Sequence, residues 1–188
     1  MPRLSPEEKT RLLALHGDLI FPRKWSDYVD QGSHQSGLWP EYIFSIIRQE
    51  SGFDPLAISG ANAYGLMQIL PSVARSFSKK STPSDLLDPQ NNVLLGSRHL
   101  RTYWDQFDGQ FILTTAAYNA SVETVKTWVK TRFNGDPLVF IEDIPYEETR
   151  IYVKLVLRNF VSYQRMAAGS QSLTFPEWCL EGIQVSKN

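Results

Sequence analysis

The chain is poor in cysteine, with Cys179 alone among its 188 residues, so an internal disulfide is excluded. Long apolar runs are lacking too. The leading candidate, residues 12–15, is followed directly by a histidine, a glycine and an aspartate, and is too short to cross a bilayer. From the same observation we expect neither a transmembrane segment nor a secretory signal at Met1. A single cysteine indicates little about the cellular compartment.

An excess of charge of one sign is absent as well, because 19 basic and 20 acidic side chains leave a net charge of −1. Without a basic stripe, a nucleic-acid partner is not expected. The sequence has no glycine-rich phosphate loop and no cluster of metal ligands, since His16, His34 and His99 stand alone. We interpret these histidines as surface or packing residues, and we expect neither a metal nor another cofactor.

What the sequence does contain is hydrophobic residues, 42% of the chain, in mostly helical spacing. Caps, prolines and glycines predict helices over 5–20, 40–51, 71–77 and 88–107, and three more that begin at 111, 121 and 145, the last reaching about residue 168. Alternation typical of a strand is confined to residues 64–70. The expected fold class is therefore mostly α, with one short β element.

We divide the chain into an N-terminal helical extension over residues 1–20, a main domain over 21–168 and a tail over 169–188. The length suits one globular domain with a real core. The tail contains Phe175, Trp178 and Leu180. Because a free tail is seldom so rich in large apolar side chains, we expect it to pack on the main domain or on a missing one.

The most informative residue is Glu50, near the end of the helix predicted over 40–51. Pro40 suits the first turn of this helix and Gly52 suits its C-terminal cap. At about 100° per residue, Glu50 lies on the apolar face. That face comprises Ile43, Ile46 and Ile47, whereas Glu41, Ser45 and Arg48 face away. Glu50 is thus predicted to be a carboxylate directed at the core.

A buried carboxylate must find partners or shift its pKa upward, because desolvation disfavours the charged form. The negative end of the helix dipole acts in the same direction. A carboxylic acid that is still protonated near neutral pH can serve as a general acid at a glycosidic oxygen. Taken alone, however, Glu50 is more simply interpreted as exposed to solvent or as paired with an arginine such as Arg48 or Arg150.

Four sequence blocks, in order between about Phe21 and Tyr163, resemble those of the lytic transglycosylases, lysozyme-like enzymes that cleave bacterial peptidoglycan. They are Arg48-Gln49-Glu50-Ser51, the segment 59–71 with Gly65-Leu66-Met67-Gln68, the segment Ala116-Ala117-Tyr118-Asn119-Ala120, and the segment 141–145 that leads into 148–153. The last block is similar to that of the soluble, Slt-type branch, which is related to the goose-type lysozymes. The resemblance implies a lysozyme-like fold.

The chain departs from this family in three places. Asn62 stands where glycine is usual, and asparagine is the next best residue for a left-handed backbone. Leu70 stands where methionine is frequent, which preserves an apolar wall. Ser121 suggests a helix N-cap where the family continues with Gly-Pro. We expect the change at Asn62 to be tolerated, and the change at Ser121 to affect the shape of the loop and not the chemistry.

The resemblance implies two catalytic residues, Glu50 and Tyr118. It also implies substrate contacts from seven further residues, namely Ser59, Tyr64, Met67, Gln68, Leu70, Asn119 and Glu142. From residue type and spacing alone, segment 60–68 can equally be a plain turn and Tyr118 a core tyrosine. In the same way, Asn119 can be a helix cap and Glu142 a surface acid near a helix start. Arg150 is expected to be a structural ion-pair partner.

A glycosidase of the usual kind needs two carboxylates. Only Glu50 has a suitable setting, because Asp54 follows Gly52 in an expected turn. The resemblance implies that Glu50 protonates the oxygen between N-acetylmuramic acid and N-acetylglucosamine. Its carboxylate then takes the proton of the muramyl C6 hydroxyl, which closes a 1,6-anhydro ring. Water, metals and cofactors take no part in this reaction.

Two other functions stay open. One is a goose-type lysozyme activity, which hydrolyses the same bond and leaves a reducing muramic acid; the other is a non-catalytic peptidoglycan-binding module. In each case the expected partner is a peptidoglycan glycan strand, in the periplasm or elsewhere in the cell envelope. An export segment would then have been removed, or the chain would be the catalytic part of a longer protein with a further domain or a partner in the cell-wall machinery.

Overall fold

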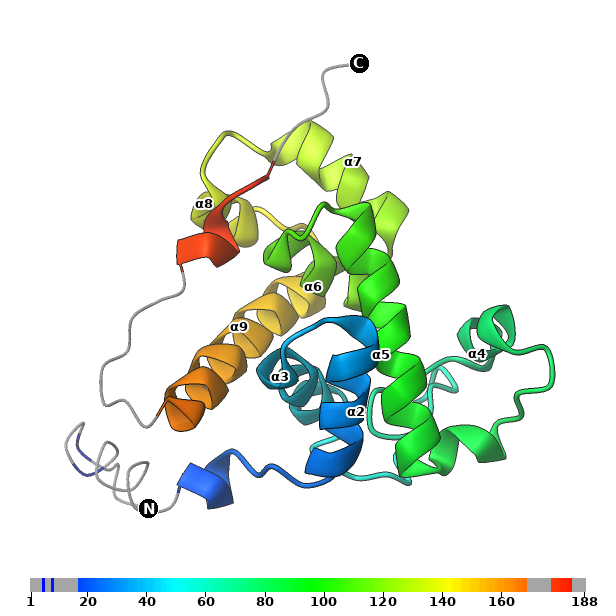
Figure 1. Cartoon of the computed structure of the whole chain (residues 1–188). Coiled ribbons are helices and arrows are strands. Elements are labelled where there is room, and N and C mark those ends of the chain that lie inside the picture. Colours follow the sequence, from blue (N-terminus) through cyan, green and yellow to red (C-terminus); the bar gives the residue numbers. More distant parts are fainter. Residues whose placement is uncertain (1–4, 6–7, 9–16, 169–176, 184–188) are drawn as a thin grey trace.

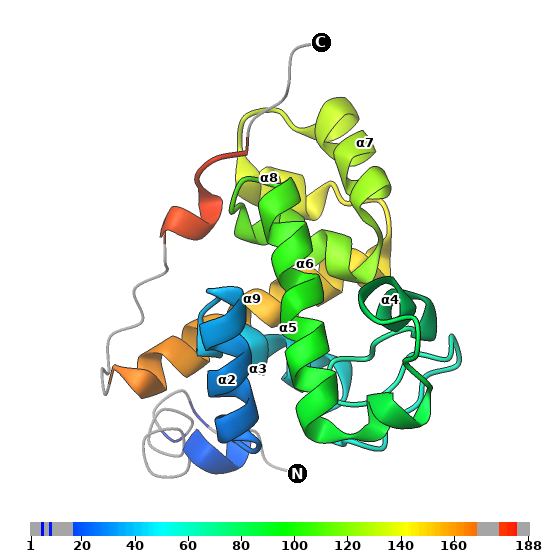
Figure 2. The ribbon, with the colours of Figure 1, turned by 45° about the vertical axis from the view of Figure 1, so that its right-hand side comes forward.

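Helices form most of the molecule, which is a computed structural model that describes Ser5, Glu8 and residues 17–168 and 177–183 (Figures 1 and 2). Most of the extension expected over 1–20 and much of the tail expected over 169–188 lie outside the described residues. In chain order the elements are α2 (Ser26–Ser36), α3 (Pro40–Glu50), α4 (Pro71–Phe77), η1 (Ser84–Leu87), α5 (Pro89–Gln106), α6 (Phe111–Asn119), α7 (Val122–Arg132), α8 (Pro137–Glu142), α9 (Glu147–Ala167) and η2 (Glu177–Leu180).

The helix starts follow from the local sequence. α3, α4, α5 and α8 each carry proline in the first turn, where its missing N–H costs no hydrogen bond. Asp88, Ser121 and Asp136 accept backbone hydrogen bonds as N-caps of α5, α7 and α8. The predicted helices over 40–51, 71–77 and 88–107 are confirmed to within a residue. The sequence pattern does not predict α2 and α8, because α2 buries only Val29, Gly32 and Ser36, and α8 is six residues long.

Two apolar clusters organise the fold. The first surrounds α3 and includes side chains from α2, α5 and α9, and the second joins α6, α7 and α8. Within this framework α3 packs chiefly on α9, and α2 packs on α5. Figures 1 and 2 show α9 passing beside α3, while α4 lies on the far side of α5 from α9.

The predicted inward face of α3 is confirmed, since Ile43, Ile46 and Ile47 are all 0% exposed. The expectation that Ser45 faces away is wrong. Ser45 is also fully buried, and its hydroxyl donates to the Glu41 carbonyl. The reason is that α2 and α9 both pack on α3, so a single solvent-facing stripe does not exist.

The short β element expected over 64–70 is reduced to two isolated antiparallel bridges, Ile58 with Tyr64 and Tyr64 with Ile69. The part of the chain that the structure describes contains no strand. Gln68 adopts a left-handed backbone with φ of 50°, so the chain turns where a strand would have to continue.

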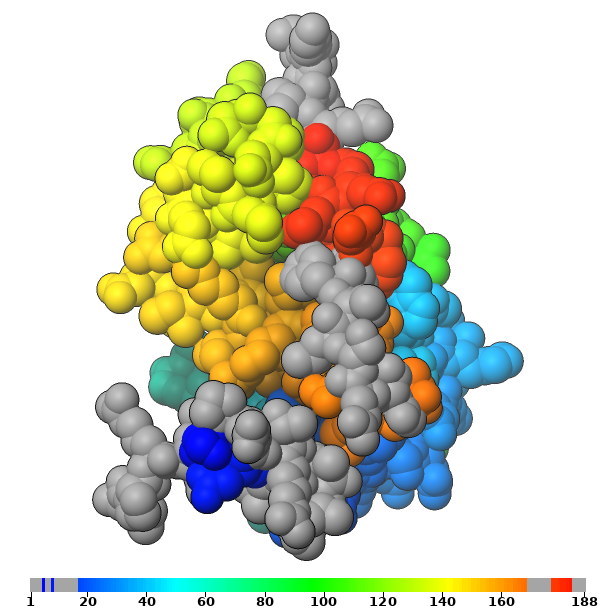
Figure 3. Space-filling view, turned by 90° about the vertical axis from the view of Figure 1, so that its left-hand side faces the viewer, coloured from blue at the N-terminus to red at the C-terminus, as the bar shows by residue number. Residues whose placement is uncertain are grey.

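The described part of the tail, residues 177–183, packs on the main domain, as Figures 1 and 3 show for η2 (red). Trp178 lies 4.7 Å from Trp39 and 6.1 Å from Phe111, measured between ring centroids. The Gln110 side chain donates to the carbonyl of Cys179, which is fully buried. Among the described helices, none combines the length and the apolar character that crossing a bilayer requires.

Candidate active site

Glu50 is the last residue of α3, and its side chain meets α9. Gly52 and Phe53, with φ of 58° and 72°, turn the backbone sharply after the helix. The Tyr152 hydroxyl of α9 donates a hydrogen bond of 2.5 Å to Glu50 Oε1. Because one carboxyl oxygen accepts this bond, the proton of a neutral Glu50 belongs on Oε2.

Burial raises the pKa of Glu50 from 4.5 to about 7. The hydrogen bond from Tyr152 opposes the rise, whereas the negative charge of Glu148 adds to it. The upward direction predicted from the sequence is thus confirmed. At neutral pH the carboxyl is present in both forms, which is the condition for a group that must first donate and later accept a proton.

The segment 57–70 is held beside Glu50 by Asn92, which lies in α5 and is fully buried. Asn92 Oδ1 accepts from the Met67 N–H at 2.7 Å, and Nδ2 donates to the carbonyls of Tyr64 and Leu86 at 2.8 Å each. Both donor hydrogens of this amide and its acceptor oxygen are therefore used, two bonds to the loop and one to η1.

Gly65 allows this arrangement because no larger residue fits. Its φ is 73°, and a Cβ at this position would collide with the Leu86 carbonyl and the Asn92 side chain. Asn62, where the family usually has glycine, also adopts a left-handed backbone with φ of 58°, as its residue type predicted.

The polar side chains of the signature mainly bind backbone. Gln68 Nε2 donates to the carbonyls of Ala57 and Gly65, at 3.1 and 2.9 Å. The Ser51 hydroxyl donates to the Leu66 carbonyl at 2.8 Å, which ties the end of α3 to the loop. Ser59 accepts from the N–H of Ala63 at 3.1 Å. These contacts set the shape of the loop that carries the predicted substrate-binding residues.

Tyr118, at the end of α6, donates its hydroxyl proton to the Met67 carbonyl at 2.9 Å. It is half-buried, and burial together with the charge of Glu50 raises its pKa well above 10. Tyr118 is thus a neutral donor beside the acid. The Met67 side chain is 0% exposed and packs over Gly96, so this residue reaches the site through its backbone.

The other predicted contacts lie in three different settings. Tyr64 is half-buried against the first apolar cluster, and Leu70 is 39% exposed at the start of α4. Asn119 Oδ1 accepts from the Thr149 hydroxyl at 2.6 Å, which links the end of α6 to the start of α9. Asn119 therefore holds together the two helices that supply Tyr118 and Tyr152.

Glu142 is exposed at the end of α8, and its carboxylate pairs with Lys154 at 2.6 Å. Lys154 lies two residues after Tyr152 on α9, so the two side chains project from nearly opposite faces of that helix. The structure thus separates Glu142 from the face of α9 that meets Glu50. Arg150 donates to the Ile144 carbonyl at 3.0 Å and serves a structural role.

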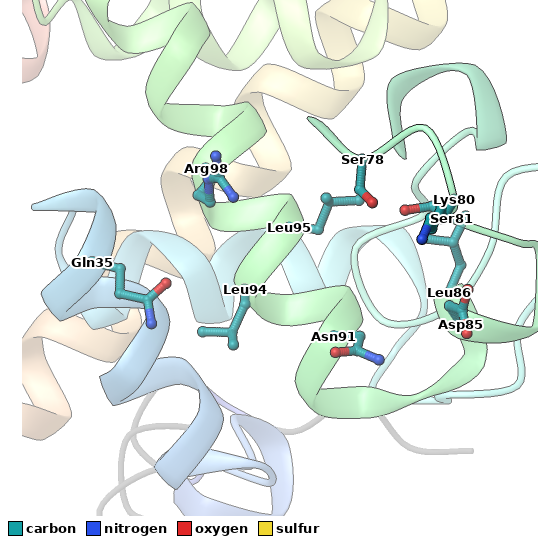
Figure 4. A pocket seen from close by; sticks show the side chains of 10 residues that line it. All are labelled: Gln35, Ser78, Lys80, Ser81, Asp85, Leu86, Asn91, Leu94, Leu95 and Arg98. Atoms are coloured by element: carbon teal, nitrogen blue, oxygen red, sulfur yellow. The ribbon is translucent and has the colours of Figure 1, made fainter. Parts of the chain in front are cut away.

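Two hollows lie apart from the Glu50 side chain. One, of about 410 Å³, is lined by α5 residues such as Asn91 and Arg98 and by the segment 78–86 (Figure 4). The other, of about 830 Å³, runs between α8 and α9 and includes Glu142 in its wall. Within the described ranges, no group of three or more histidine, cysteine, aspartate or glutamate side chains could hold a metal ion.

Three residues of the site are not singled out by the sequence. Tyr152 and Glu148 stand in the fourth resembling block, but the resemblance assigns no role to them. The sequence marks Asn92 only by its position, because it lies in a predicted helix although asparagine is a poor helix former. A buried asparagine in a helix interior needs partners elsewhere, and that cost is the only sequence clue to its role.

The mostly helical domain, with the half-buried acid Glu50 at the end of α3, is of the lysozyme-like class. Residues 27–141 match the family model described as the transglycosylase SLT domain. The chain belongs to this family.

Curated relatives agree with this assignment. The soluble lytic murein transglycosylase of Escherichia coli K12 is 35% identical over 172 residues, which cover 87% of this chain and 26% of the relative. The membrane-bound lytic murein transglycosylase D of the same strain is 34% identical over 113 residues, 57% of this chain and 25% of the relative. The chain thus spans about a quarter of the length of these relatives.

Solved structures show the same fold. The 70 kDa soluble lytic transglycosylase of Escherichia coli superposes with a TM-score of 0.79 at 33% identity, covering 89% of this chain and 28% of that one. An inactive mutant of lytic transglycosylase Slt from Pseudomonas aeruginosa gives 0.77 at 31% identity, covering 94% and 29%. The predicted mostly α, lysozyme-like fold is therefore confirmed.

Proposed function

We propose that this chain cleaves the β-1,4 bond between N-acetylmuramic acid and N-acetylglucosamine in peptidoglycan, with formation of a 1,6-anhydro-muramic acid end. The observation that carries the proposal is the half-buried carboxyl of Glu50, with a pKa raised to about 7 and one oxygen held by Tyr152. The relatives named as lytic murein transglycosylases support the substrate class.

Two proton transfers make up the reaction. Glu50 Oε2 gives its proton to the glycosidic oxygen while the bond from muramyl C1 to that oxygen breaks, and the N-acetylglucosamine leaves as an alcohol. The resulting carboxylate then takes the proton of the muramyl C6 hydroxyl, whose oxygen forms the new bond to C1. Glu50 ends in its starting state, and no water, metal or cofactor is consumed.

The other predicted site residues have two kinds of proposed role, contact with the sugar and positioning of the loop. Tyr118 lies beside Glu50 and orients the loop through the Met67 carbonyl. Ser59, Tyr64, Gln68 and Leu70 stand on or beside that loop and are the proposed sugar contacts. Asn119 and Met67 act by positioning.

Two acidic residues outside the loop have different roles. Glu148 raises the proton affinity of Glu50 and is exposed at the start of α9, where it can also meet the substrate. Glu142 lines the hollow between α8 and α9. Its proposed contacts are therefore limited to a distant part of the glycan or its peptide.

The product identifies the reaction. After incubation with purified sacculi, mass spectrometry of the soluble muropeptides should show mainly the anhydro form, lighter than the reducing form by one water. A main product with reducing muramic acid, or with oxygen from labelled water, would instead identify a goose-type hydrolase. Binding to sacculi without any soluble product would identify a non-catalytic module.

The proposed setting is the periplasm or another part of the cell envelope, where glycan strands are the partner. The chain spans about a quarter of the length of these relatives. As part of the proposal, an additional domain or a cell-wall partner selects the site of cleavage.

A further inference from the structure

An aromatic group of three residues, Phe77, His99 and Tyr103, adjoins Tyr118. His99 and Tyr103 are four residues apart on α5 and share one helix face, with ring centroids 4.4 Å apart. Phe77, the last residue of α4, lies 6.4 Å from His99. The His99 ring is 5.7 Å and the Tyr103 ring 6.4 Å from the ring of Tyr118.

The three rings form a corner and not a parallel stack. The planes of His99 and Tyr103 meet at 58°, and those of His99 and Phe77 meet at 82°. The Arg98 guanidinium lies over the Phe77 ring, 5.0 Å from its centroid. Residues of α4 and α5 thus form this corner, and Tyr118 of α6 lies next to it.

The corner keeps polar atoms available to a ligand. His99, Tyr103 and Phe77 are each half-buried, and within the described residues neither the His99 imidazole nor the Tyr103 hydroxyl has a hydrogen-bond partner. Three buried polar atoms in the described residues lack a hydrogen-bond partner, and none of them belongs to His99 or Tyr103. The polar atoms of these two side chains therefore reach solvent. Glu123, whose charge contributes to raising the pKa of Tyr103, adds a carboxylate nearby.

The protonation states suit hydrogen bonding to an uncharged ligand. Burial lowers the pKa of His99 to about 4, so its imidazole is neutral at the pH where Glu50 titrates, with one nitrogen that donates and one that accepts. The Tyr103 hydroxyl is also neutral, because burial raises its pKa. An N-acetylhexosamine presents an apolar ring face together with hydroxyl and acetamido groups, which match aromatic faces with polar edges.

We propose that Phe77, His99 and Tyr103 form a subsite for one N-acetylhexosamine ring of the glycan, next to the ring that contacts Tyr118, with His99 as the residue that both stacks on the sugar and hydrogen-bonds to it. The inference rests on the proposed function for the identity of the polymer. It does not depend on whether Glu50 transfers a proton, because the subsite binds and does not react.

The test measures binding without turnover. In a Glu50→Gln background, the affinity for tetra-N-acetylchitotetraose is measured by calorimetry or by NMR titration for the parent and for three added changes. His99→Ala removes ring and polar edge, His99→Phe keeps the ring alone, and His34→Ala is the matched control, an exposed histidine on α2. Loss of one aromatic contact corresponds to roughly three- to tenfold weaker binding.

We expect His99→Ala to weaken the affinity by about this factor or more, His99→Phe to lie between it and the parent, and His34→Ala to have no effect. The inference is overturned if all four proteins bind equally, or if the Glu50→Gln parent fails to bind the oligosaccharide at millimolar concentration. Because His99→Phe retains the packing of the ring, a folding defect in His99→Ala does not remove the test.

Turnover separates this inference from the proposed function. On sacculi, His99→Ala with intact Glu50 should raise KM more than it lowers kcat and should leave the product unchanged. If the wild-type protein yields no anhydro product while His99→Ala still weakens oligosaccharide binding, the proposed function fails and the subsite stands. If the anhydro product forms and the affinities are unchanged, the reverse holds.

Discussion

The hydroxyl of Tyr152 lies 2.5 Å from Glu50 Oε1, although 102 residues of sequence separate the two side chains. α3 supplies the acid and α9 supplies the donor, and these two helices form one of the most extensive helix contacts of the fold. The same packing that buries Glu50 therefore also delivers the hydrogen bond that limits the rise of its pKa. The protonation of Glu50 and the packing of the core are therefore coupled in a single interface.

Glu50→Gln should fold and lose nearly all cleavage of sacculi. An amide preserves the volume and can still accept from Tyr152, but it cannot deliver a proton, and removing a general acid costs at least about 10²–10⁴-fold in rate. Release of soluble muropeptides measures the loss, and circular dichroism checks the fold. Turnover near that of the parent, in a folded variant, would contradict the assignment.

The same variant should also change how stability depends on pH. Glu50 has a pKa of about 7 in the folded protein against an ordinary value of 4.5, so ionising it destabilises the folded state as pH rises from 4.5 to 7. The wild-type protein should lose up to about 3 kcal/mol of unfolding free energy across this window relative to Glu50→Gln. Denaturant unfolding of both proteins at pH 4.5 and pH 8 measures the difference.

Tyr152→Phe should move the alkaline limb of the rate profile to higher pH. The wild-type rate should fall as pH rises through about 7, because Glu50 must be protonated to act. The hydrogen bond from Tyr152 lowers this pKa, and its removal raises the proton affinity of the carboxyl. Tyr146→Phe, at a tyrosine 57% exposed near the start of α9, is the matched control and should leave the profile in place.

Tyr118→Phe should lower kcat by roughly tenfold and destabilise the fold by about 1 kcal/mol, the net value of one hydrogen bond. The variant loses the hydrogen bond from Tyr118 to the Met67 carbonyl. This is one of the two hydrogen bonds that hold the Met67 backbone in the loop beside Glu50; the other joins the Met67 N–H to Asn92. Affinity for tetra-N-acetylchitotetraose should be largely preserved. If the rate does not change, Tyr118 is a packing residue and has no part in the reaction.

Asn92→Ala should cost both stability and activity. It removes three hydrogen bonds, two to the segment that carries Gln68 and one to the Leu86 carbonyl of η1, which corresponds to about 2–4 kcal/mol of unfolding free energy. Asn91→Ala is a close control, since Asn91 is exposed and its contact with Asp88 uses only its backbone N–H. Thermal unfolding and sacculus turnover should both distinguish the two variants.

Features set by local sequence were predictable, and features set by packing between helices were not. Helical phase placed Glu50 on the buried face of α3, because the phase depends only on neighbours within the helix. The same phase misplaced Ser45, because two other helices pack on α3. Alternation suggested a strand through Gln68, but a left-handed backbone at that residue turns the chain.

The long-range partners of the site could not be predicted in this way. Tyr152 reaches Glu50, and Asn92 reaches Met67, only because the helices that carry them are packed in this fold. Their residue types carry no separate mark in the sequence. The resemblance to the family therefore supplied the order of the blocks, whereas the contacts between the blocks came from the structure.

Glu142→Gln and Glu148→Gln should have clearly different effects, although both acids flank the start of α9. Glu148→Gln removes a negative charge that raises the pKa of Glu50, so the alkaline limb of the rate profile should move to lower pH, opposite to Tyr152→Phe. Glu142→Gln breaks only an exposed ion pair with Lys154, worth about 0–1 kcal/mol, and should leave the profile unmoved.

For Glu142→Gln we also expect a milder loss of substrate use than for Glu50→Gln, with the anhydro product unchanged, because its carboxylate lies on the opposite side of α9 from the acid. Rates on sacculi between pH 5 and 9 for the two variants and the parent provide the comparison. A shifted profile in Glu142→Gln, together with an unshifted one in Glu148→Gln, would exchange the roles given to these two acids and place the glycan along the α8–α9 groove.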